Sequence, residues 1–238
     1  MDNHSGVGVL DKAIVVLDCL EDGAKTLTSL VEASGLSRPT AYRLAVALEH
    51  HRLVVRDQLG RFTLGPRLTE LAASATNDDP LLAAASEVLS RLRDATGESA
   101  QLYRREGDIR RCVVAAERAS GLRDTVPVGL AMPLTAGSAA QVLLAWEPTA
   151  EAQPLLAKAA FSIATLAHVR RRGWAASVAE REPGVASVSA PVRDGSGRVV
   201  AAVSVSGPID RLGRSPGRRH SAAVMRAADA LSRAAVRR

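Results

Sequence analysis

The sequence predicts a mixed α+β protein that is organised as two domains. Amphipathic helical segments and one short hairpin fill the first 65 residues, whereas longer β-prone runs appear only in the second half. Between them, Pro66 opens a helical segment with a polar end, which is typical of a linker helix. The 238 residues, 47% of them hydrophobic, suffice for two cores. We therefore expect a first domain at 1–65, a linker helix at 66–79 and a second domain at 80–238.

The first domain is predicted to contain three helices. Residues 9–20 place their apolar side chains on one helical face. Thr26 is a suitable N-cap for a second helix that Gly35 ends. A short turn leads to a third helix with Ser37 at its N-cap and Pro39 in its first turn, where a missing N–H costs nothing. Two helices joined by such a turn are typical of a helix-turn-helix.

The third helix and the hairpin after it carry candidate DNA contacts. Polar and basic side chains cluster near the N-terminus of the helix, opposite its apolar stripe, as in a helix that enters the major groove. Strand-like runs at 53–56 and 61–64 then indicate a β-wing. Arginines on one face of an isolated helix are usually only solvated, but the order of elements favours a winged helix-turn-helix. The candidate contacts are Ser37, Arg38, Thr40, Tyr42, Arg43, Arg56 and Arg61. Thr40 and Tyr42 could instead serve packing.

The charge balance favours a polyanionic partner. The chain has a formal net charge of +6, and at 38–67 arginines outnumber the two acidic residues Glu49 and Asp57. Only 3% of the residues are aromatic, so stacking platforms for single-stranded nucleic acid are not expected. Double-stranded DNA is therefore the predicted partner.

The second domain is predicted to alternate between helices and hairpins, an arrangement typical of an α+β domain. Gly97 ends its first helix, and Gly-containing turns join its strands in pairs. The predicted helices lie at 81–96, within 133–146, at about 166–172 and from about Gly217. The predicted strands lie at 99–105, 109–117, 185–192 and 199–207.

Serine residues alternate with apolar residues in the last two predicted strands. Ser187 and Ser189 share one strand face, and Ser204 and Ser206 share another, because side chains alternate between faces along a strand. Such hydroxyl rows often mark the solvent side of a sheet. The alternative is a concave polar pocket, in which each hydroxyl donates to and accepts from a small polar ligand.

Other patterns argue against catalysis, metal binding and membrane insertion. Cys19 and Cys112 are too isolated for a disulfide scaffold or a thiolate metal site, and we expect both in cores. His168 and His220 lack metal-ligand spacing and are expected to be solvated, and no nucleophile motif surrounds the serines. No uncharged apolar stretch reaches about 18 residues. We expect a cytoplasmic, non-enzymatic protein without metal or cofactor. An enzymatic second domain, or DNA binding without an effector, are the alternatives.

Both halves of the chain resemble the IclR family of bacterial transcriptional regulators. GLSRPTAYRLAVALEHHRLVVRDQLGRFTLG is similar to the winged helix of the family, and RRRGWAASVAEREPGVASVSAPVRDGSGRVVAAVSVSGP to its effector-domain signature. TGESAQLYRREGD, SGLRDTVPVG and AAVSVSGPIDRL look most like the actinobacterial NdgR and AreB type, which regulates amino-acid biosynthesis genes, leucine among them. Phe62 stands where the wing of the family usually has tyrosine, a change expected to affect packing more than contact.

The resemblance implies a GAF-like effector-binding domain, a homodimer or dimer of dimers, and a palindromic operator. Carried over by motif, the effector-binding residues are Ser138, Ala139, Ser177, Ser187, Ser204 and Ser206. Some members place an acidic residue and a cysteine where this chain has Ser177 and Ser187, so the ligand of those members does not transfer.

We expect instead a small polar effector, such as an amino acid or a related carboxylate, beneath the loop at 130–138. The hydroxyls and the N–H groups of the helix after Ala136 are expected to hold it without a buried cation.

Overall fold

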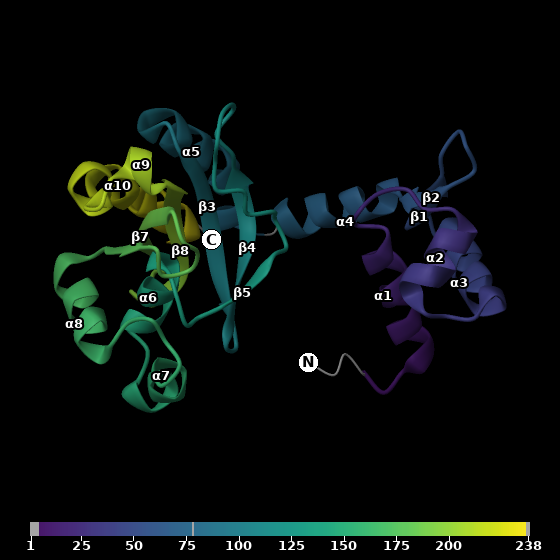
Figure 1. Cartoon of the computed structure of the whole chain (residues 1–238), viewed down its shortest axis with the longest axis horizontal. Helices are drawn as coiled ribbons and strands as arrows, with labels where there is room; N and C mark the ends of the chain where they lie inside the picture. Colours follow the sequence, from purple (N-terminus) through teal and green to yellow (C-terminus); the bar gives the residue numbers. More distant parts are fainter. Residues whose placement is uncertain (1–4, 78, 237–238) are drawn as a thin grey trace. The chain divides into compact units, whose positions relative to one another are not determined.

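The computed structural model describes residues 5–77 and 79–236. The chain divides into two compact units, Met1–Asp78 and Asp79–Arg238, and each is described by itself (Figure 1). Within the described residues no helix is long and apolar enough to cross a membrane.

The first unit contains the predicted helices, and their observed ends lie within two residues of the ends that were predicted. Its helices are α1 (Gly8–Cys19), α2 (Leu27–Ser34), α3 (Arg38–His50) and α4 (Pro66–Asn77). The Thr26 hydroxyl accepts a hydrogen bond from the backbone N–H of Ser29, and Gly35 ends α2 in the left-handed conformation with φ of 67°. Ser37 occupies the N-cap of α3 without a hydrogen bond to the backbone N–H groups, and its hydroxyl lies 2.9 Å from that of Thr40.

The wing closes the first unit. Strands β1 (Val54–Arg56) and β2 (Phe62–Leu64) pair antiparallel, and Lys25 forms a further bridge to Phe62. Phe62 is almost fully buried in a core with Val16, Leu30 and Leu48, so this side chain serves packing, as expected. Cys19 is half-buried beside this core.

The second unit is built on a six-stranded antiparallel sheet with strand order β5-β4-β3-β8-β7-β6. The strands are β3 (Ser99–Glu106), β4 (Ile109–Ala116), β5 (Ala131–Pro133), β6 (Ala175–Val178), β7 (Val185–Arg193) and β8 (Val199–Pro208). The hairpins predicted for β3 with β4 and for β7 with β8 are confirmed. Because β3 pairs with β8, the two hairpins form one continuous sheet.

Helices cover both faces of this sheet (Figure 1). On one face, α5 (Pro80–Thr96) and α10 (Pro216–Val236) pack on side chains such as Leu102, Val188 and Val203. On the other face, α6 (Ser138–Ala145) and α8 (Ile163–Arg172) pack around side chains such as Cys112 and Ala202. The buried position expected for Cys112 is therefore confirmed.

Four short elements were not among the predicted ones: β5, β6, α7 (Thr149–Leu156) and α9 (Ile209–Leu212). The sequence of β6 is AASV, whose small side chains have little intrinsic preference for strands. Helix α7 contains Pro154, which normally disfavours a helix interior. Both elements form because they pack against the larger sheet and helices rather than through their own propensity.

Candidate functional site

The exposed face of α3 carries the candidate contacts predicted for it. Ala41, Ala45 and Leu48 are buried, whereas Tyr42 and Arg43 lie on the exposed side of the helix. The side chain of Tyr42 is 48% exposed. An exposed aromatic ring next to an exposed guanidinium leaves both groups accessible to a ligand on this face.

Arg38 and Arg43 of α3 make few polar contacts with other described residues. Among the residues that the structure describes, Arg43 has no hydrogen bond or ion pair, and Arg38 has one long hydrogen bond of 3.4 Å to the Thr28 hydroxyl. Thr40 is half-buried and its hydroxyl contacts that of Ser37. The two arginines are thus free to bind phosphates or base edges, while Ser37 and Thr40 bond to each other.

The arginines of the wing already have partners. Arg56 forms an ion pair of 3.2 Å with Glu49 of α3, and its guanidinium lies 4.4 Å from the centre of the Phe62 ring. Arg61 forms an ion pair of 2.7 Å with Asp57, which also accepts the backbone N–H of Arg61. These carboxylates fix the wing and offset part of its positive charge.

All six residues predicted for the effector site line one small cavity in the second unit. Ser177, Ser187, Ser204 and Ser206 come from adjacent strands, and the start of α6 supplies the other two, Ser138 and Ala139. The serines alternate with Val188, Val203 and Val205, which face α5 and α10, so the hydroxyls lie on the α6 side of the sheet. The solvent-facing alternative for these rows is therefore wrong.

The hydroxyls form a connected network. The Ser138 hydroxyl oxygen lies 2.6 Å from that of Ser187 and 2.7 Å from that of Ser189, and Ser177 lies 2.8 Å from Ser187. Ser189 donates to Ser204 over 2.9 Å. Separately, Ser206 donates to the side-chain oxygen of Gln101 over 3.2 Å. Ser189 and Gln101 belong to this polar layer, although neither was a predicted site residue.

The N-terminus of α6 is occupied by side chains of the protein. The N–H of Gly137 donates to the carboxylate of Glu180 over 3.0 Å, and that of Ser138 donates to the Ser177 hydroxyl over 3.1 Å. Burial raises the pKa of Glu180 above its ordinary value. The expectation that these N–H groups await a ligand carboxylate is therefore wrong, because Glu180 already places a carboxylate there.

Two arginines line the cavity, contrary to the expectation of a site without a buried cation. Arg110 is 3% exposed, donates to the Pro133 carbonyl over 2.5 Å, and leaves its Nε without a partner. No carboxylate pairs with it among the described residues. Arg181 forms an ion pair of 2.5 Å with Asp124, which also lines the cavity. Burial lowers the pKa of Arg110, and the nearby charge of Arg181 lowers it further.

The cavity itself is small. Its volume is about 20 Å³, which leaves room for roughly one water molecule. The loop at 130–138 is predicted to cover the site, but only its residues Gly137 and Ser138 line the cavity. Asp124, from the segment before this loop, also lines it. The lining presents serine hydroxyls and two guanidiniums, which are groups that can donate hydrogen bonds to an anion.

The two histidines of the second unit differ in their surroundings. His168 lies within hydrogen-bond distance of Arg171 at an exposed position, as expected. His220 is 5% exposed within α10, so the expectation that it is solvated is wrong. Burial lowers its pKa, which favours the neutral imidazole.

Comparisons with known proteins cover both units. Residues 9–58 match the IclR helix-turn-helix domain, and residues 73–233 match the family described as bacterial transcriptional regulator IclR C-terminal. The glycerol operon regulatory protein of Streptomyces coelicolor is 31% identical over 221 residues, which are 86% of this chain and 86% of that protein.

Solved structures share the fold. An IclR transcriptional regulator from Alicyclobacillus acidocaldarius has a TM-score of 0.80 at 26% identity and covers 96% of this chain and 99% of its own. An IclR homologue of Microbacterium hydrocarbonoxydans, complexed with 4-hydroxybenzoate, has a TM-score of 0.81 at 20% identity and covers 95% of this chain and 98% of its own. Because both family regions occur in order along one chain, this protein belongs to the IclR family and is a DNA-binding transcriptional regulator.

Proposed function

We propose that this regulator senses a small carboxylate in its second unit and controls amino-acid biosynthesis genes of the leucine type. In this proposal residues 1–65 bind DNA, 66–79 form the linker helix, and 80–238 form a GAF-like domain for effector binding and assembly. The pathway rests on the likeness of SGLRDTVPVG and AAVSVSGPIDRL to the NdgR and AreB type. The relatives reported for this chain do not carry that pathway in their names.

The uncompensated charge of Arg110 is the observation that carries the effector proposal. A buried guanidinium without a carboxylate costs several kcal/mol, and a bound anion offsets this cost. Ser138, Ser187 and Ser204 add hydroxyls that donate and accept within the same cavity. The Microbacterium protein, which is similar in fold alone, is complexed with 4-hydroxybenzoate, itself a carboxylate.

For DNA binding we propose that Arg38, Tyr42 and Arg43 of α3 contact bases or phosphates. Ser37 and Thr40 at the start of this helix, and Arg56 and Arg61 on the wing, are proposed to contact the DNA backbone. One winged helix offers a small specific interface, so a homodimer or a dimer of dimers on a palindromic operator is the proposed assembly. Chromosomal DNA as the ligand places its action in the cytoplasm.

The effector proposal is tested by thermal unfolding with acetate, L-leucine, 4-methyl-2-oxopentanoate and 4-hydroxybenzoate. A ligand present at 100 times its Kd stabilises the folded form by about 2.7 kcal/mol, which raises Tm by several degrees. Arg110→Met should abolish the carboxylate-induced shift without lowering the Tm of the free protein, because it removes an unpaired buried charge. Arg105→Met, which removes a cation paired with Glu147, should keep the shift.

Ser204→Ala is the milder variant of the same experiment. Losing one hydrogen bond costs about 0.5–1.5 kcal/mol, so ligand affinity should fall by roughly two- to thirteenfold while DNA binding without ligand survives. Ser196→Ala, in the exposed turn between β7 and β8, is the matched control. Unchanged shifts in both Arg110→Met and Ser204→Ala would remove this cavity as the effector site.

The pathway is tested by mapping chromosomal binding sites with and without added leucine. Sites upstream of leucine-type biosynthesis genes, with occupancy that changes on leucine addition, are the expected result. Occupied sites confined to unrelated catabolic genes would reject the pathway and leave the carboxylate-binding proposal intact.

A further inference from the structure

The cavity must enlarge before any carboxylate can enter. Its volume of about 20 Å³ accommodates roughly one water molecule, and even the smallest carboxylate has three heavy atoms. Most of its wall belongs to the central strands and to α6, which pack within a continuous core. Gly137, Arg181 and Asp124 lie outside these elements, and Asp124 belongs to the longest irregular stretch, residues 117–130, which join β4 to β5 without helix or strand. We call residues 117–130 the covering segment.

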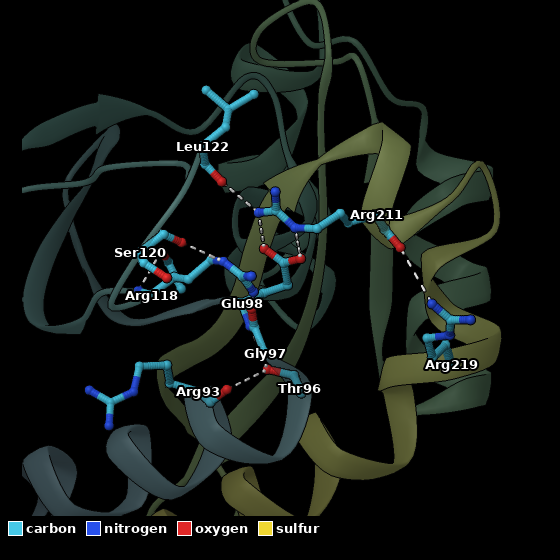
Figure 2. A network of polar contacts seen from close by, with 10 residues as sticks. Arg93, Thr96, Gly97, Glu98, Arg118, Ser120, Leu122, Arg211 and Arg219 are labelled. Carbon is cyan, nitrogen blue, oxygen red and sulfur yellow. Dashed lines mark hydrogen bonds and ion pairs between the residues drawn. The ribbon is translucent and has the colours of Figure 1, made fainter.

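One end of the covering segment is firmly attached to the domain. Figure 2 shows Arg211 in a two-point contact with the buried carboxylate of Glu98, at 2.6 and 2.8 Å, while the same guanidinium donates to the Leu122 carbonyl over 2.6 Å. Arg118 donates to the carbonyls of Gly97 and Ser120. Because Glu98 is only 3% exposed, this network is a fixed anchor for residues 118–122.

The other end is attached to β4. The N–H of Gly129 donates to the Cys112 carbonyl over 2.8 Å, and the N–H of Cys112 donates to the Leu130 carbonyl over 3.0 Å. Between the two attachments, residues 123–126 make no backbone-to-backbone hydrogen bond within the described part of the chain. The buried side chains of Asp124 and Val126, a long contact of 3.8 Å from the Cys112 thiol to the Val126 carbonyl, and an exposed ion pair of Arg123 with Glu117 hold this stretch. Because it lacks backbone-to-backbone hydrogen bonds, it is the part of the wall that we expect to move most easily.

Asp124 places a carboxylate inside the cavity that the effector must use. Its side chain is 7% exposed, and its Oδ1 lies 2.5 Å from the guanidinium of Arg181. The second partner of Arg181, Glu182, lies 3.4 Å away and is largely exposed. Arg110, Arg181 and Asp124 together leave one positive charge in excess among the lining residues. The bond from Asp124 to Arg181 has the same chemistry that a carboxylate ligand would form.

We infer that Asp124 is a built-in competitor, which an effector carboxylate displaces from Arg181 to open the covering segment between its two anchors. The inference rests on the proposed function. The incoming carboxylate binds Arg181 and Arg110, and the freed Asp124 carboxylate is solvated by water as residues 123–126 lift. Ligand entry thereby changes the conformation of a surface segment.

The test compares acetate and 4-methyl-2-oxopentanoate binding to the full-length protein and to Asp124→Asn by titration calorimetry. Asparagine keeps the shape and a neutral hydrogen bond to Arg181 but lacks the competing charge, so Kd should fall roughly tenfold. A residue that only holds Arg181 in place would give the opposite sign, because its loss would weaken binding. Glu117→Gln removes the exposed ion pair of the same segment with Arg123 and should leave Kd unchanged.

Limited trypsin digestion of the unmodified protein provides a second measurement that does not depend on the variant. Adding either carboxylate should speed cleavage after the exposed Arg123, whereas ordinary ligand stabilisation slows cleavage. Unchanged or weaker binding by Asp124→Asn, or slower cleavage at this site, overturns the inference while the effector proposal stands. If neither protein binds any carboxylate of the panel, the effector proposal fails and the inference falls with it.

Discussion

At the scale of single residues, the arginines proposed to contact DNA differ in whether a carboxylate already binds them. Arg43 has no partner among the described residues, whereas Arg61 must release or share Asp57 before it can bind a phosphate. Breaking an ion pair offsets part of the energy gained from a new one. The free arginine of α3 therefore has more to contribute than the paired arginine of the wing.

We predict that Arg43→Ala weakens operator binding by about 1–3 kcal/mol, the range for an arginine that reads a base. Arg61→Ala should cost less than about 1 kcal/mol, because Arg61 must release or share Asp57 when it binds a phosphate, which offsets part of the gain. Fluorescence anisotropy with an operator duplex at several salt concentrations measures both. Full binding by Arg43→Ala, or a larger loss for Arg61→Ala, would contradict this ranking.

The sequence predicts the serines of the cavity better than its charges. Period-two alternation identified the serine rows, and only the face they occupy needed the structure. The sequence also allows Arg110 to be predicted as a lining residue, because it lies two residues before the buried Cys112 and shares its strand face. Glu180 and Arg181 follow β6 in a turn without periodicity. Their contacts with Gly137 and Asp124, more than 40 residues away, form only in the tertiary structure.

At the scale of elements, the carboxylate of Glu180 binds the N-terminus of α6, and burying this carboxylate costs free energy. Glu180 accepts from the N–H of Gly137 and from the Gln141 amide, while the side-chain oxygen of Gln141 is buried without a partner. A negative charge suits a helix N-terminus, but burial raises the pKa of Glu180. Burial therefore outweighs the favourable contacts, and the folded protein takes up a proton there more readily than the unfolded chain.

We predict that Glu180→Gln removes a pH-dependent penalty. A carboxyl with a raised pKa contributes stability that is fully present below its ordinary pKa of 4.5 and is lost as pH rises through the raised value. As pH rises from about 4.5 to 8, the Tm of the unmodified protein should therefore fall relative to the Tm of the variant. In the variant, the new glutamine amide can also donate to the unpaired side-chain oxygen of Gln141. Thermal unfolding across this range is the measurement. A constant difference in Tm would show that Glu180 titrates as in the unfolded chain.

The same scale shows which elements the sequence can predict. Helices with clear end signals, such as α2 with Thr26 and Gly35, agree with the sequence to within a residue. β6 and α7 have no such signals, since their side chains are small or include a proline. β6 carries Ser177 to the cavity, so the proposed effector site depends on a strand whose short AASV sequence has a weak local preference.

At the scale of the whole molecule, the proposed DNA contacts and the effector cavity lie in different units of the chain. A regulator that joins two such sites must link them by a coupling free energy, and this coupling acts equally in both directions. The factor by which a ligand changes operator affinity is therefore the factor by which the operator changes ligand affinity.

We predict that a palindromic operator duplex, with half-sites roughly 34 Å apart, changes the Kd of the tightest-binding carboxylate by about 5- to 150-fold. Calorimetric titration of the carboxylate into protein with and without saturating duplex measures one direction, and anisotropy of the duplex with and without the carboxylate measures the other. The control is Arg43→Ala, measured at a duplex concentration that saturates only the unmodified protein. Because this variant remains free of DNA there, its Kd for the carboxylate should equal the value measured without duplex. Equal carboxylate affinity with and without duplex would show that the cavity binds its ligand without controlling DNA binding, since a ligand that does not discriminate between two states shifts neither.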